Sequence, residues 1–183
     1  HGETLGTVTW ATGLLSKTER ITVFGTVHAP LFHPVIAAKQ CVTADHVGRG
    51  RFGLNIVAGW NEGEFEMFGV QQREHEARYA YAQDWIDAIK AAWGPEDDFD
   101  FIGEHIKLRK VRSKPKPYGG TRPLIMNAGS TPTGQAFALR NCDAYFTATS
   151  ESRQGGPEAI KTMIANVVPS AIKETRYFLP ARY

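Results

Sequence analysis

Residues 50–61, with the sequence GRFGLNIVAGWN, decide how this chain is expected to fold. Their central part, FGLNIVA at 52–58, is apolar at both even and odd positions. That pattern is typical of a strand that is covered on both faces, as in a parallel sheet. Gly48 and Gly50 mark the end of the segment that comes before it. We therefore predict a buried strand over 52–58.

Working outward from this strand, three further short apolar runs are predicted to be strands of the same kind. They are 20–28, 123–127 and 144–147. Residues with an apolar period of three to four predict helices between and around them. These predicted helices are 3–16, 34–47, 73–93, 132–140 and 157–166. A polar loop is predicted at 59–72, and a small hairpin around Gly103 and Glu104 within 94–118.

This alternation of strands and helices predicts an α/β fold built from parallel βαβ units. Two architectures fit the pattern, an open doubly wound sheet and a (β/α)8 barrel. A complete barrel needs roughly 200 residues or more, whereas four predicted strands make half of one. The order of elements alone leaves both architectures open.

Composition limits the function classes. The chain has 183 residues, of which 42% are hydrophobic and 22% charged, and we expect a single domain over 1–183. The formal charge of +2 gives no reason to expect a nucleic acid or a membrane as partner. Two distant cysteines, Cys41 and Cys142, and no visible signal peptide favour reduced thiols in a cytoplasmic protein. Because the chain opens at His1 without methionine, we expect it to be a fragment.

Candidate site residues lie at the carboxyl ends of the predicted strands, where both architectures place their chemistry. Asn55 interrupts an otherwise apolar strand, and a buried amide costs about 1–3 kcal/mol unless it is hydrogen-bonded. It is therefore either a structural amide or a group that faces a polar ligand. Thr26 and Glu64 are weaker candidates, since a strand threonine and a loop glutamate often have no role beyond structure or solubility.

A second group of candidates suits an anion. Gly129 and Ser130 precede the helix at 132–140, and the amides of a first helical turn bind phosphate readily. Ser130 is equally suited to capping that helix. Arg78 and Tyr79, on the long predicted helix, can supply a guanidinium and a hydroxyl for the same anion, or can simply face solvent.

Several common chemistries lack a motif in this sequence. The six histidines show no HxxxH or HExxH spacing for a metal. There is also no CxxC, Walker loop or GxSxG. We therefore expect no metal, dithiol, P-loop or nucleophile-elbow chemistry.

Three stretches together resemble the bacterial-luciferase-like flavin monooxygenases. They are TERITVFGTVHAPLFHPVIAAKQCVTADHVGRGRFGLNIVAGWNEGEFEMFG at 18–69, REHEARYAYAQDWIDAIKAAW at 73–93 and RPLIMNAGSTPTGQAFALRNCDAYFTAT at 122–149. The resemblance is greatest to the branch with pyrimidine oxygenase and alkanesulfonate monooxygenase, and it covers about 3–150, leaving 151–183 unassigned. It implies a (β/α)8 TIM barrel of which this chain is the central part.

The resemblance also implies roles for the candidate residues. Thr26 and Asn55 match the catalytic pair that forms the oxygen pocket. The positions that match the family's flavin-binding residues are Asn55, Glu64, Arg78, Tyr79 and Ser130. No metal is implied.

By the same resemblance, the expected function is an FMN-dependent monooxygenase that uses reduced flavin and O2 on a small organic substrate, of the pyrimidine or amide kind. A separate NAD(P)H-dependent flavin reductase is then the expected source of reduced FMN, and a homo-oligomer the expected assembly. Three alternatives stay open: a non-catalytic flavin-binding relative, a deazaflavin-dependent oxidoreductase, and a phosphate-binding isomerase or aldolase. The polar pair Thr26 and Asn55 argues against the deazaflavin reading.

Overall fold

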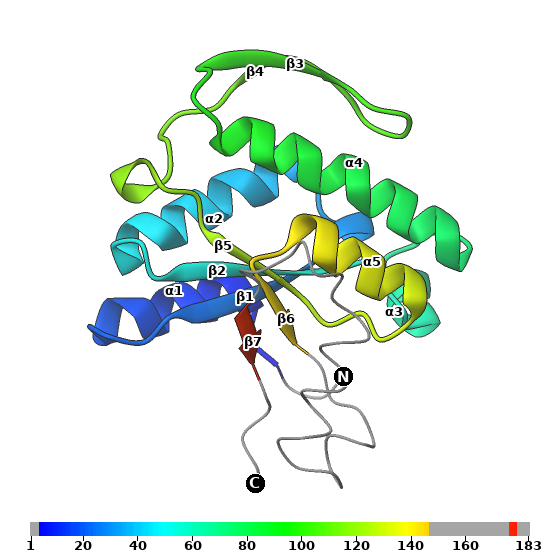
Figure 1. Ribbon diagram of the computed structural model, residues 1–183, viewed down its shortest axis with the longest axis horizontal. Helices are drawn as coiled ribbons and strands as arrows, with labels where there is room; N and C mark the ends of the chain where they lie inside the picture. Colours follow the sequence, from blue (N-terminus) through cyan, green and yellow to red (C-terminus); the bar gives the residue numbers. More distant parts are fainter. Residues whose placement is uncertain (1–3, 147–175, 179–183) are drawn as a thin grey trace, which may run out of the picture. The chain divides into compact units, whose positions relative to one another are not determined.

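Helices alternate with short parallel strands along most of the chain, as the computed structural model shows (Figure 1). The structure describes residues 4–146 and 176–178. The chain divides into two units, His1–Leu124 and Ile125–Tyr183, each with its own parallel strands.

The first unit contains four α-helices, two short 3-10 turns, a parallel pair of strands and an antiparallel hairpin. Its helical elements are α1 (Thr7–Lys17), η1 (Ala29–Leu31), α2 (Pro34–Gly48), α3 (Glu62–Met67), α4 (His75–Trp93) and η2 (Tyr118–Gly120). Its strands are β1 (Val23–His28), β2 (Phe52–Val57), β3 (Asp98–Ile102) and β4 (Lys107–Arg112). Strands β1 and β2 are parallel, with Thr26 directly opposite Asn55.

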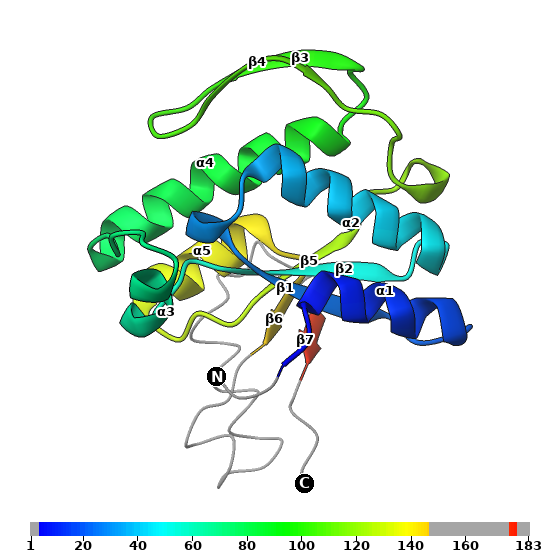
Figure 2. The same ribbon diagram turned by 180° about the vertical axis from the view of Figure 1, so that it is seen from behind.

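The core of this unit lies between the parallel strands and the helices. Helix α1 packs against β1 and α2, and α2 packs against β2 and α4 (Figure 2). Phe52, Leu54 and Ile56 alternate along β2 and are fully buried. Trp85 of α4 is also fully buried, and its indole N–H donates to the Phe32 carbonyl at 2.7 Å. Helices therefore cover one face of the β1–β2 pair.

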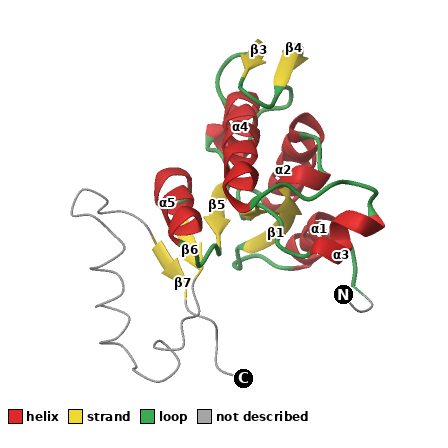
Figure 3. Cartoon of the chain, turned by 90° about the vertical axis from the view of Figure 1, so that its right-hand side faces the viewer, coloured by secondary structure: helices red, strands yellow, loops and turns green. Residues whose placement is uncertain are grey.

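Strands β3 and β4 form an antiparallel hairpin on the outer side of α4 (Figure 3). Leu108 and Val111 are buried. Asp98 and Arg112 are exposed, with Oδ1 of Asp98 3.6 Å from Nε of Arg112. Leu108 and Val111 are three residues apart rather than two, and the register of the hairpin shifts between Phe99 and Phe101. The ribbon buries these apolar side chains and leaves charged ones in solvent. The hairpin therefore covers α4.

The second unit repeats the strand–helix–strand pattern. Its elements are β5 (Leu124–Asn127), α5 (Pro132–Asn141), β6 (Ala144–Phe146) and β7 (Arg176–Phe178). Strand β6 is parallel to both β5 and β7. Asp143 fixes the start of β6, because its side chain accepts from the Ile125 N–H at 2.8 Å while its own N–H donates to the Ile125 carbonyl at 2.8 Å.

The structure confirms the predicted α/β order for the described residues, with differences at some elements. The first helix begins at Thr7, four residues later than predicted. The first strand begins at Val23, three residues later than predicted. The predicted loop 59–72 contains helix α3, which Asn61 caps by accepting from the Gly63 N–H at 3.2 Å. The strand end at 147–150 and the helix at 157–166 lie outside the described residues. In the described part of the chain, no helix is long and apolar enough to cross a membrane.

Candidate functional site

Thr26 and Asn55 form a polar pair on the face of β1 and β2 that the core does not use. They are direct partners in the parallel register, and both are half-buried. The Asn55 Nδ2 donates to the Thr26 Oγ1 at 3.0 Å. Thr26 thus accepts this bond and retains its own hydroxyl proton to donate elsewhere.

The second polar atom of the Asn55 amide is unsatisfied. Its Oδ1 is buried and has no hydrogen-bond partner in the part of the chain that the structure describes. An unmet buried acceptor costs about 1–3 kcal/mol, so such an atom usually accepts from a bound water, ion or ligand. The pair therefore offers a hydroxyl donor and an amide acceptor side by side, which suits the polar edge of a flat heterocycle.

Glu64 joins this region through a histidine. Glu64 belongs to α3, and its Oε2 lies 3.3 Å from Nδ1 of His28, the last residue of β1. Residues 26 and 28 share a face of β1 because side chains alternate along a strand. The carboxylate is thus attached to the same strand face as Thr26.

Arg78 and Tyr79 lie in the first turns of α4. The Arg78 Nη1 donates to the carbonyl of Gly59, just after β2. Its Nε is buried without a partner among the described residues. The Tyr79 ring packs against His75, with ring centroids 5.2 Å apart. Arg78 therefore fixes the end of β2 and keeps one buried N–H to offer an anion.

A cavity adjoins this arginine. It measures about 420 Å³ and is bordered by residues of α3, the connecting segment and α4, including Phe65, Gln72 and Arg78. The Gln72 Nε2 is a second buried nitrogen without a partner among the described residues. These two N–H groups can donate to oxygen acceptors, while Glu62, Glu66 and Glu74 also border the cavity.

Ser130 belongs to the second unit, in the connection between β5 and α5. Helix α5 is capped by Thr131, whose Oγ1 accepts from the Gly134 N–H at 3.2 Å. The capping role that the sequence left open for Ser130 is therefore wrong. Its side chain is exposed beside the helix N-terminus, where a phosphate is favoured. Gly129, just before it, accepts from the Tyr145 hydroxyl at 2.9 Å.

The structure thus brings Thr26 and Asn55 together and attaches Glu64 to the same strand through His28. Sequence reasoning gave no role to His28. The feature of the sequence that could have identified His28 is its position two residues after Thr26 on a predicted strand. No set of three or more His, Cys, Asp or Glu side chains in the described residues is placed to hold a metal ion.

Comparison with known proteins gives a consistent set of matches. Residues 1–168 match the model of the family described as luciferase-like monooxygenase. The chain is 36% identical over 140 residues to the FMNH(2)-dependent dimethylsulfone monooxygenase of Pseudomonas putida, covering 76% of this chain and 38% of that protein. It is 32% identical over 144 residues to the pyrimidine monooxygenase RutA of Pseudomonas syringae, covering 78% of this chain and 39% of RutA.

Among solved structures, DmoA from Hyphomicrobium sulfonivorans superposes with a TM-score of 0.80 at 20% identity. The match covers 97% of this chain and 43% of DmoA. At that identity the likeness concerns the fold. The chain spans about two fifths of the length of the relatives that it matches.

Proposed function

Because the chain belongs to the luciferase-like monooxygenase family, we propose that it binds reduced FMN and uses it with O2 to oxygenate a small organic substrate. Its α/β fold is part of a (β/α)8 barrel of that family, and not an open doubly wound sheet. The observation that carries the proposal is the Thr26–Asn55 pair with its buried, unpartnered Oδ1.

The polar atoms of the first unit fit a flavin. The Asn55 Oδ1 would accept from an N–H of the ring, and the Thr26 hydroxyl, on the same strand face, would hold the oxygen. Glu64 would hold a further polar group of the cofactor. When bound, reduced FMN supplies the two electrons that O2 activation needs.

The phosphate group of FMN would be bound by cationic and N–H groups. The unpartnered Nε of Arg78 and the hydroxyl of Tyr79 would bind phosphate oxygens from α4. The resemblance also assigns a phosphate contact to Ser130, which precedes α5. Phosphate binding by charge-assisted hydrogen bonds thus complements the ring contacts of Asn55.

The remaining parts of the proposal follow from the family resemblance. An NAD(P)H-dependent flavin reductase would supply the reduced cofactor, and the protein would act as a cytoplasmic homo-oligomer. Residues 1–183 would belong to a single barrel domain. The relatives are named for dimethylsulfone and for pyrimidine. We infer a small polar substrate of the pyrimidine or amide kind for this protein.

Flavin titration followed by turnover tests this proposal. The purified protein is titrated with oxidised and reduced FMN and with a deazaflavin, and then supplied with a reductase, NADH, ¹⁸O2 and a candidate substrate. We expect tight binding of reduced FMN and one ¹⁸O atom in the product. Preference for the deazaflavin would favour the oxidoreductase alternative. Flavin binding that yields only hydrogen peroxide with every pyrimidine, amide and sulfone tried would favour the non-catalytic alternative.

A further inference from the structure

We propose that His28 is a positioning residue that holds the Glu64 carboxylate in place for the flavin. This inference rests on the proposed function, because it concerns how a residue of the same site is oriented. The contact joins Nδ1 of His28 to Oε2 of Glu64 at 3.3 Å. A carboxylate oxygen can only accept, so a hydrogen bond between these two atoms requires the proton on Nδ1.

The contact links two separate elements. His28 is the last residue of β1, whereas Glu64 lies in the six-residue helix α3 beyond β2. A short helix of this kind gains little stability from its own backbone bonds, so tertiary contacts must fix its direction. Phe65 supplies the apolar contact, being fully buried. His28 supplies a polar one, and both contacts help to fix where Glu64 lies.

Burial distinguishes this pair from an ordinary surface pair. The side chains of His28 and Glu64 are 24% and 14% exposed. Those of His75 and Glu76, a pair formed by two consecutive residues, are 38% and 77% exposed. Solvent screens an exposed pair and leaves it with little effect. The His28–Glu64 pair also connects residues far apart in sequence, so it can help to orient α3 against β1.

The neighbourhood gives the contact a function. His28 and Thr26 share one face of β1, and Thr26 holds the Asn55 amide at 3.0 Å. Through its contact with His28, Glu64 therefore lies on the same face of β1 as Thr26. The pair of Thr26 and Asn55 is the one proposed to hold the flavin ring and the oxygen. A carboxylate held in one rotamer loses less conformational entropy when a ligand binds. The expected consequence of losing His28 is weaker flavin binding, with the fold retained.

Four variants test the inference: His28→Leu, His28→Asn, Glu64→Gln, and His28→Leu combined with Glu64→Gln. The Nδ2 of asparagine can occupy the place of the histidine Nδ1, so His28→Asn keeps the donor. The dissociation constant of oxidised FMN is measured by fluorescence quenching, and the thermal unfolding of each cofactor-free variant is recorded beside it. Glu76→Gln and His105→Gln, at exposed positions, are the controls.

We expect His28→Leu and Glu64→Gln each to weaken FMN binding about three- to tenfold, and the double variant to be about as weak as Glu64→Gln alone. His28→Asn and both controls should bind FMN like the wild type. If His28→Leu lowers only the unfolding temperature and leaves the FMN affinity unchanged, the inference is wrong. Additive losses in the double variant would also overturn it. Failure of the wild type to bind FMN would instead overturn the proposed function itself.

Discussion

Asn55 and Thr26 lie opposite each other in the parallel pair β1–β2, and the Asn55 amide donates to the Thr26 hydroxyl at 3.0 Å. The bond leaves the Asn55 Oδ1 buried without a partner among the described residues. Such an atom is satisfied by a bound water, ion or ligand, or its desolvation lowers the stability of the fold. The arrangement therefore links the local structure of two strands to the proposed chemistry.

The first prediction concerns Asn55. Asn55→Ala should lower product formation about 100-fold or more, because a preorganised polar group at the reacting centre is removed. The affinity for FMN should fall much less, since the phosphate contacts from Arg78 are retained. Product is quantified by mass spectrometry, and FMN binding by fluorescence. Thr26→Ser, which keeps the hydroxyl, is the control. Unchanged turnover in Asn55→Ala would remove Asn55 from the site.

A second prediction concerns Arg78. Arg78→Ala should weaken FMN binding by about 1.5–3 kcal/mol, because a charge-assisted contact to the phosphate is lost. It should also loosen the segment after β2, since Arg78 donates to the Gly59 carbonyl. Titration with riboflavin, which has no phosphate, separates the two effects. A loss that is equally large for riboflavin would mean that Arg78 acts only on the loop.

Asp45 predicts a pH dependence of stability. Burial raises the pKa of its carboxyl above the ordinary value, despite hydrogen bonds from the Tyr118 and Phe52 N–H groups. A raised pKa in the folded state stabilises the fold at low pH, and this contribution is lost as the pH rises from about 4 through the folded-state pKa. Asp45→Ala should cost about 1–3 kcal/mol through the lost hydrogen bonds. The cost should be larger at about pH 4.5 than at about pH 7.

Asp100 provides the opposite case in the same experiment. Hydrogen bonds from the Lys110 N–H, and then from the Arg109 side chain, lower the pKa of its carboxyl. Its stabilising contribution is therefore present above the ordinary pKa and is lost as the pH falls. Urea unfolding of Asp45→Ala and Asp100→Ala at several pH values should show trends of opposite sign. Parallel trends would contradict the assignment for Asp45.

The two cysteines should differ in reactivity. Burial, and next the nearby Asp45 charge, raise the pKa of Cys41 to about 12, and its side chain is fully buried. Cys142 is half-buried. Because only the thiolate reacts, iodoacetamide at about pH 8 should label Cys142 first in the native protein and both cysteines in urea. Peptide mass spectrometry reads out each site. Equal native rates would contradict the buried position of Cys41.

The sequence predicted the strand pair and its polar residues well, for a physical reason. A run that is apolar on both faces identifies a buried strand, so Asn55 within it stands out as a costly exception. Helix α3 was missed because it has six residues and a single buried side chain, Phe65, too little for a periodic signal. The contact of His28 with Glu64 depends on that helix. It was therefore invisible until the structure placed α3.

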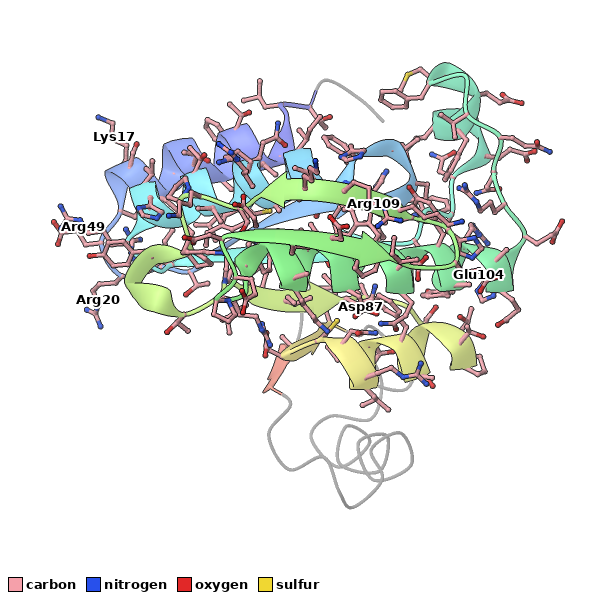
Figure 4. The ribbon with its side chains drawn as sticks, turned by 90° about the horizontal axis from the view of Figure 1, so that it is seen from above. Lys17, Arg20, Arg49, Asp87, Glu104 and Arg109 are labelled. Carbon is pink, nitrogen blue, oxygen red and sulfur yellow. The ribbon has the colours of Figure 1, made fainter. Side chains whose placement is uncertain are left out.

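Arg51 is a second residue whose contacts the sequence did not predict. At the end of β2 away from the proposed site, its guanidinium donates to three carbonyl groups, those of Leu15 at 3.1 Å, Thr18 at 2.8 Å and Ile21 at 3.0 Å. These bonds tie the end of α1 to the segment that enters β1. In contrast, Arg20 projects outward at the same side of the view as Lys17 and Arg49 (Figure 4).

The last prediction follows from that difference. Arg51→Gln should lower the free energy of unfolding by about 2–3 kcal/mol, because charge-assisted bonds to three carbonyl groups are lost. Arg20→Gln, at an exposed position, should change it by less than about 0.5 kcal/mol. Urea unfolding measures both. The affinity for FMN should stay unchanged in the folded Arg51→Gln protein, since Arg51 lies at the opposite strand end from Asn55 and Glu64. Equal stability of the two variants would show that water hydrogen-bonds to the three carbonyl groups as well as Arg51 does.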